Sequence, residues 1–206
     1  MSELKDFIEI AKRVIKIEND NSTKPKFSSV FEFPFTDDYC KWINSKSEKF
    51  KRKGRKPKYF WNDFYGEIIE RQIKPAGIKI PIEWETKIIS YPTRSVYLIA
   101  DINEKLYYVG KCLYTPIIRL FDRLIPKSYN PQENNVPEIW NKYLSQGKKV
   151  KCVYFYDLSF DPEILEYYLL DEYKILNNSI SNLYNKKMPN KKFCDKVQKI
   201  RTKINQ

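Results

Sequence analysis

The sequence predicts an α+β fold, in which a small sheet of three strands is flanked by helices. Short runs rich in β-branched and aromatic residues, at 95–100, 106–109 and 150–158, are typical of strands. Apolar residues spaced three and four apart, at 7–15 and again at 164–173, are typical of amphipathic helices. Elements of these two kinds bury their apolar surfaces by packing helices against a sheet.

The first ninety-one residues are expected to form a mainly helical extension. A first helix carries Phe7, Ala11 and Val14, residues 19–26 form a polar connection, and a second helix begins at a Thr36 cap. A strongly basic block follows at 46–58. Such a block is usually a solvated loop, but as a set it could lie along DNA phosphates. The residues chosen as substrate contacts are Lys51, Arg52, Lys53 and Arg55.

A hairpin follows the boundary at Tyr91-Pro92-Thr93. Its strands are 95–100 and 106–109, joined by a polar turn at 101–105. Side chains on paired strands come within about 5 Å of each other, so Tyr97 and Tyr108 could converge on one substrate atom. Gly110 would permit a close approach at the end of the second strand, and Lys111 would place a cation at the rim.

Two further helices are predicted, one on each side of a third strand. Thr115-Pro116 is a cap and first-turn signal for a helix on which Arg119 and Arg123 share a face. A long connection at 124–150 leads to the strand at 150–158. Asp161-Pro162 then begins a helix with Glu166 in its first turns.

The order of these residues resembles that of the GIY-YIG nuclease family. Ser95-Val96-Tyr97 stands in place of the name-giving Gly-Ile-Tyr, and Tyr108-Val109-Gly110 in place of Tyr-Ile-Gly. Arg119 and Glu166 follow in the family's order, and the match covers roughly residues 95–185. The resemblance implies a nuclease core at 92–186 built on an antiparallel sheet. The asparagine that closes the family's motif set corresponds either to Asn178, favoured by its spacing from the other motifs, or to Asn185, favoured by the Leu183-Tyr184-Asn185 sequence around it.

The resemblance also implies roles in the hydrolysis of a phosphodiester. Family members often carry a histidine where this chain has Arg123, and the chain contains none, so another group must be the base. We expect Tyr97 to be the base, with Lys111 lowering its pKa and Tyr108 orienting the water. Arg119 would hold the phosphate, with Arg123 and Asn178 as further substrate contacts. Glu166 would bind one Mg²⁺, with Glu163 as the weaker alternative.

Charge and cysteine usage agree with a nucleic-acid partner. A net charge of +12 over 206 residues favours a polyanion, and double-stranded DNA is the expected one. The four cysteines are scattered singly, which argues against structural zinc. We expect a cytoplasmic protein with no membrane segment. The basic tail at 187–206 is expected to contain a short helix at 193–204.

The leading functional hypothesis is a Mg²⁺-dependent, sequence-specific endonuclease of double-stranded DNA, most like the stand-alone restriction enzymes of the family. A homing or mobile-element nuclease is the alternative within the class. A non-catalytic DNA-binding protein on a decayed nuclease core is the alternative outside it, because the first motif lacks its glycine and the histidine is missing. A palindromic target would need a homodimer or sequential nicking by a monomer.

Overall fold

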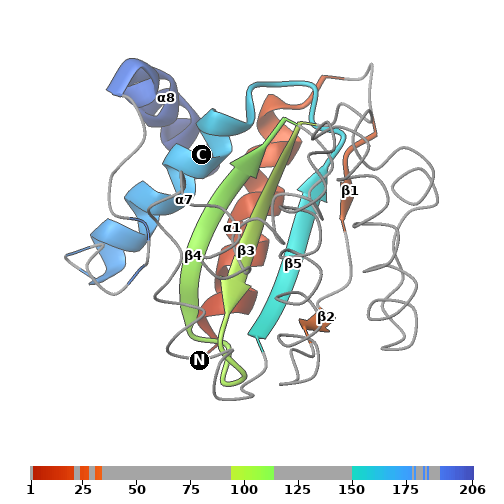
Figure 1. Cartoon of the computed structure of the whole chain (residues 1–206). Helices are drawn as coiled ribbons and strands as arrows, with labels where there is room; N and C mark the ends of the chain where they lie inside the picture. Colours follow the sequence, from red (N-terminus) through yellow and green to blue (C-terminus); the bar gives the residue numbers. More distant parts are fainter. Residues whose placement is uncertain are drawn as a thin grey trace, which may run out of the picture.

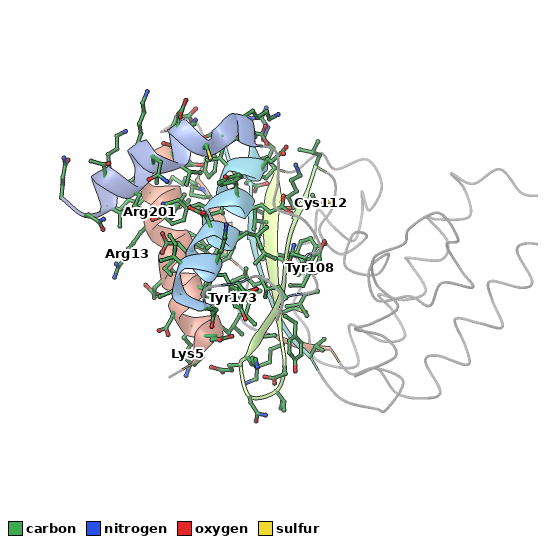
Figure 2. All side chains as sticks on the ribbon, turned by 90° about the vertical axis from the view of Figure 1, so that its left-hand side faces the viewer. Lys5, Arg13, Tyr108, Cys112, Tyr173 and Arg201 are labelled. Carbon is green, nitrogen blue, oxygen red and sulfur yellow. The ribbon has the colours of Figure 1, made fainter. Side chains whose placement is uncertain are left out.

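The described part of the chain forms a sheet backed by helices. The computed structural model describes residues 2–20, 24–27, 31–33, 94–113, 150–177, 179, 183, 185 and 191–206. The helices are α1 (Glu3–Glu18), α7 (Pro162–Asn177) and α8 (Cys194–Ile204), the last preceded by the short 3₁₀ helix η3 (Lys191–Phe193). They lie on one side of the sheet (Figures 1 and 2). The predicted α+β fold is confirmed.

The three longest strands form the antiparallel sheet that was expected. β3 (Ser95–Ala100) lies between β4 (Leu106–Cys112) and β5 (Val150–Tyr156). Two short strands, β1 (Lys26–Phe27) and β2 (Phe31–Phe33), also pair with β5. The N-terminal extension therefore contributes strands as well as a helix, and these strands use backbone groups of β5 that would otherwise lie at an open edge.

The ends of the strands are set by local backbone geometry. In the β3–β4 hairpin, Asp101 and Lys105 are hydrogen-bonded through their backbones and Glu104 has a positive φ of 67°. A register shift after Ile99 leaves Tyr107 as the extra residue of β4. β5 ends before Asp157, whose φ of 58° is incompatible with a strand. The third strand is thus two residues shorter than predicted, while β4 continues three residues beyond its predicted end.

One hydrophobic core joins the helices to the sheet. α1 begins at Ser2, whose side chain accepts a hydrogen bond from the Lys5 backbone N–H, and it buries its Phe7 and Val14. α8 buries Val197 and Ile200 in the same cluster as Leu98 of β3. The first helix and the basic tail therefore pack with the predicted nuclease core. The helix predicted at 193–204 is confirmed, beginning one residue later.

Several sequence predictions fall on residues outside this part of the chain. They are the Thr36 helix, the basic block at 46–58, the helix after Thr115-Pro116, the connection at 124–149 and Asn178. Among the helices that the structure does describe, none combines the length and the apolar character needed to cross a membrane.

Candidate active site

Three tyrosines meet on the face of the sheet that points away from the helices. In the strand register, Tyr97 of β3 lies opposite Gly110 of β4 on one side and opposite Tyr154 of β5 on the other. The ring centroid of Tyr97 is 5.9 Å from that of Tyr108 and 5.8 Å from that of Tyr154. Figure 2 shows Tyr108 on the side of the sheet opposite α1, α7 and α8. We call Tyr97, Tyr108, Gly110 and Tyr154 the tyrosine face.

The missing side chain of Gly110 makes the tyrosine packing possible. A Cβ atom at this position would overlap the ring and hydroxyl of Tyr97 and would lie 2.6 Å from Cε1 of Tyr108. Real Cβ atoms do not approach other atoms so closely, so both rings occupy space that only glycine leaves open. The close approach expected at Gly110 is therefore made by the two motif tyrosines themselves.

The tyrosine face is closed to solvent. Tyr97 is 1% exposed and Tyr108 9% exposed, and the Tyr97 hydroxyl oxygen is buried. Burial, followed by the nearby Cys152 thiol, holds the pKa of Tyr154 well above its usual value, so this phenol stays neutral. Tyr154 is part of the tyrosine face, although the sequence did not predict it as a site residue. A water or phosphate reaches the Tyr97 hydroxyl only when the packing over this face opens.

Two carboxylates lie together at the start of α7. The Asp161 side chain accepts a hydrogen bond from the Glu163 backbone N–H at 2.9 Å, and Pro162 occupies the first helical position. Glu163 and Glu166 are three residues apart and so lie on one side of the helix. The Lys111 ammonium contacts both, at 2.5 Å from Glu163 Oε2 and 3.9 Å from Glu166 Oε2. Glu163 and Glu166 are called the carboxylate pair below.

The position of Lys111 differs from the one expected. Successive side chains of a strand point to opposite faces, so Tyr108 and Gly110 share the tyrosine face while Lys111 points to the side of the helices. Its ammonium offsets one of the two negative charges of the carboxylate pair. This geometry does not support an action of Lys111 on the pKa of Tyr97.

The carboxylate pair has the chemistry of a magnesium site. Mg²⁺ takes hard oxygen ligands and is commonly held by one or two carboxylates, with waters and substrate phosphate completing its shell. The side chains of Glu163 and Glu166 are 17% and 12% exposed, so both can reach a bound ion. Within the described ranges no group of three or more His, Cys, Asp or Glu residues forms a fuller metal cage. Glu163, the weaker alternative in the sequence analysis, lies closer to Lys111 than Glu166 does, and its three-residue spacing from Glu166 could have shown that the two share one side of the helix.

Asn185 is tied to the backbone of the second motif. Its Oδ1 accepts from the Val109 N–H at 2.9 Å and its Nδ2 donates to the Val109 carbonyl at 2.6 Å. The Asn185 side chain thus satisfies an edge of β4 that no other described strand covers. Asn185 therefore holds the Tyr108-Val109-Gly110 segment in place.

The remaining candidates divide into two groups. Cys112 is 5% exposed and is a small buried side chain. The other predicted substrate contacts lie outside the described residues, namely Arg119, Arg123, Asn178, Lys51, Arg52, Lys53 and Arg55.

Comparisons of this chain with protein-family models, with curated proteins and with solved structures find no match. The residues described above are therefore the basis for assigning a function.

Proposed function

We propose that this chain is a Mg²⁺-dependent endonuclease that hydrolyses phosphodiester bonds of double-stranded DNA at specific sequences, as restriction endonucleases do. The observation that carries the proposal is the packing of Tyr97 and Tyr108 into the space left by Gly110. Tyr97, Tyr108 and Gly110, three of the residues through which the sequence resembles GIY-YIG nucleases, thus form one packed unit, while Glu166 lies with Lys111 on the helix side of the sheet. The net charge of +12 suits a DNA substrate, and the cytoplasm is the proposed compartment.

In this mechanism the tyrosine face handles the attacking water. Tyr97 accepts the proton of the water as its phenolate, and Tyr108 orients the water for in-line attack on phosphorus. A phenol with an ordinary pKa near 10 is almost entirely protonated at neutral pH, so forming the phenolate needs positive charge close to the site. Arg119 is the proposed source, through bidentate hydrogen bonds to the phosphate oxygens.

The carboxylate pair serves the leaving group. Glu166, with Glu163 beside it, would hold Mg²⁺, which when bound would supply positive charge for the departing oxygen. Lys111 offsets one of the two negative charges of the pair. The buried Tyr97 hydroxyl requires that DNA binding open the tyrosine face before the reaction.

The proposal is tested by incubating the purified protein with unmethylated phage DNA in Mg²⁺ or in chelator and separating the products on a gel. Discrete fragments are expected from the wild type with Mg²⁺ only. Glu166→Ala should give none, and Tyr97→Phe should lower the rate by about 10²–10⁴-fold. Tyr108→Phe is the matched variant that keeps the ring packing and removes only the orienting hydroxyl, so its loss should be smaller. A Tyr97→Phe protein with full turnover would refute the role of Tyr97, and absence of cleavage by the wild type would refute the nuclease.

A non-catalytic DNA-binding protein is the second candidate. It is favoured by the closed tyrosine face and by the engagement of Lys111 with Glu163, both of which are typical of groups that serve packing. Salt-sensitive retention of DNA by the wild type and by Glu166→Ala, with no cleavage by either, would establish this candidate in place of the nuclease.

A further inference from the structure

A regular row of lysines runs along the surface of the C-terminal helix. The intervals between them are four, three and four residues, so they fall on one side of the helix that begins at η3 and continues through α8. All are exposed, and they line a hollow of about 650 Å³ together with Glu18, Asp195 and Thr202. We call this row the lysine stripe: Lys192, Lys196, Lys199 and Lys203.

The stripe is held on a rigid support. On the inner side of α8, Val197 and Ile200 are buried in the core. Arg201 donates from Nε and Nη2 to Glu172, at 2.9 and 2.6 Å, and from Nη2 to Asp171 at 2.9 Å. Burial lowers the pKa of Arg201, but the hydrogen bonds to Glu172 and Asp171 outweigh it, so the pKa is raised. Because the inner side is anchored, the outer side presents the lysines in a constant arrangement.

The charge of the hollow is positive. Its lining contains the four lysines of the stripe and two carboxylates, which leaves an excess of two positive charges. One carboxylate, Glu18, pairs with Lys196 at 2.8 Å, while the Lys196 side chain remains 46% exposed. A concave basic surface on a fixed helix is suited to a polyanion.

We propose that the lysine stripe binds the phosphate backbone of duplex DNA, as a contact separate from the tyrosine face. The choice of DNA as the polyanion rests on the proposed function. The eleven residue steps from Lys192 to Lys203 span about 16 Å of helix, a length comparable to about five phosphates along one strand. Side chains of lysine neutralise phosphates without reading bases, so this contact adds affinity and not sequence preference.

The helix that carries the stripe packs against α7. The hydroxyl of Tyr167, the residue that follows Glu166, is 2.9 Å from Sγ of Cys194 at the start of α8. Figure 2 shows α8 together with α1 and α7 on the side of the sheet opposite Tyr108. α8 and α7, which carries Glu163 and Glu166, therefore lie on the same side of the sheet.

An anionic membrane is the competing partner for a lysine-rich helix. Helices that lie on membranes insert a free apolar face beside their basic one. The apolar side of α8 is already buried by the core, with Val197 0% and Ile200 1% exposed. The structure therefore favours DNA.

The test measures the affinity for a short duplex of arbitrary sequence as a function of salt, in chelator so that no cleavage occurs. The stripe variant changes four lysines to glutamine. The control variant removes the same charge from four exposed lysines elsewhere, Lys5→Gln, Lys12→Gln, Lys105→Gln and Lys174→Gln. The changes in the stripe variant are Lys192→Gln, Lys196→Gln, Lys199→Gln and Lys203→Gln.

The stripe variant should lower the slope of log affinity against log salt by about 3 to 4, because each lost phosphate contact removes about 0.9. The control variant should keep the wild-type slope. Equal losses in both variants would show that only net charge matters, and an unchanged slope in the stripe variant would show that DNA binds elsewhere; either result overturns the proposal. Binding of the wild type to phosphatidylserine vesicles but not to duplex would overturn it in favour of a membrane. Because binding is measured without cleavage, failure of the nuclease proposal leaves this result intact.

Discussion

The two faces of the sheet are both buried but are built from different chemistry. The face toward the helices carries only hydrocarbon side chains at its centre, among them Val96, Leu98 and Phe155. The opposite side of the sheet carries the residues of the tyrosine face, and the Cys152 thiol lies beside Tyr154. Burying hydroxyls and thiols costs free energy that burying hydrocarbon does not.

This difference separates stability from chemistry. The helix side has the composition expected of a core that holds α1, α7 and α8 on the sheet. The tyrosine side of the sheet buries polar atoms, and burial raises the pKa values of Tyr154 and Cys152 there. Such features are concentrated at functional sites. We therefore expect mutations of neighbouring β3 residues to lower stability by different amounts.

The largest expected effect on stability is at Leu98. Leu98→Ala leaves a cavity in the core between the sheet and the helices and should lower the free energy of unfolding by about 2–5 kcal/mol. Tyr97→Phe, one residue away on the other face, should cost less than about 1.5 kcal/mol because the ring packing is kept. Urea unfolding of both variants measures the contrast. If both variants lost the same free energy of unfolding, the two sides of the sheet would not differ in their contribution to stability.

Gly110→Ala should be the next most damaging change. The added methyl group overlaps the rings of Tyr97 and Tyr108, and neither buried ring can swing away, so we expect a loss of about 1–3 kcal/mol. DNA cleavage should fall further than stability, because the two tyrosines move relative to each other. Cys112→Ala, at the next position on the same face of β4, is the control that adds no overlap. Wild-type stability in Gly110→Ala would show that the tyrosines do not depend on the glycine.

Asn185→Ala tests how the second motif is held. It leaves the Val109 N–H and carbonyl without their side-chain partner, at a cost of about 1–3 kcal/mol. Asn185→Asp keeps an acceptor for the N–H but places a carboxylate against the Val109 carbonyl, so it should be at least as destabilising at neutral pH. Thermal unfolding compares the two variants. A neutral Asn185→Asp substitution would exclude the paired hydrogen bonds.

The sequence predicted the elements whose residues carry a periodic pattern. β3 was predicted to its last residue because a β-branched run ends there at a polar turn, and α7 was predicted from its Asp161-Pro162 start. β1 and β2 could not be predicted, since strands of two and three residues have no periodicity and exist only because β5 offers them an edge.

The site was predicted less completely than the fold. Tyr97 and Tyr108 do meet, but a regular hairpin with Ala100 opposite Leu106 would have placed Tyr97 opposite Val109 and left Tyr108 on the other face. The extra residue Tyr107 in β4 brings the two rings to one face. Alternation along β4 could have shown that Lys111 points away from Tyr108. The contact between Tyr154 and Tyr97, and the hydrogen bonds between Asn185 and Val109, join segments that lie far apart in the chain. Such contacts are decided by tertiary packing, which no local pattern encodes.

The smallest expected effect concerns the pH dependence of stability. The unfolded chain releases the Tyr154 proton near pH 10, whereas the folded protein holds it to a higher pH because the phenol is buried. The folded state is therefore at full stability below pH 10 and loses up to about 1.4 kcal/mol per pH unit above it from this group. Cys152, whose pKa burial also raises, begins to contribute near pH 9. Tyr154→Phe should match the wild type within about 1 kcal/mol at pH 7 and lose stability less steeply between pH 10 and 11. Identical slopes for the two proteins in urea unfolding would show that the Tyr154 hydroxyl ionises in the folded state, and the tyrosine face would then be open to water instead of closed.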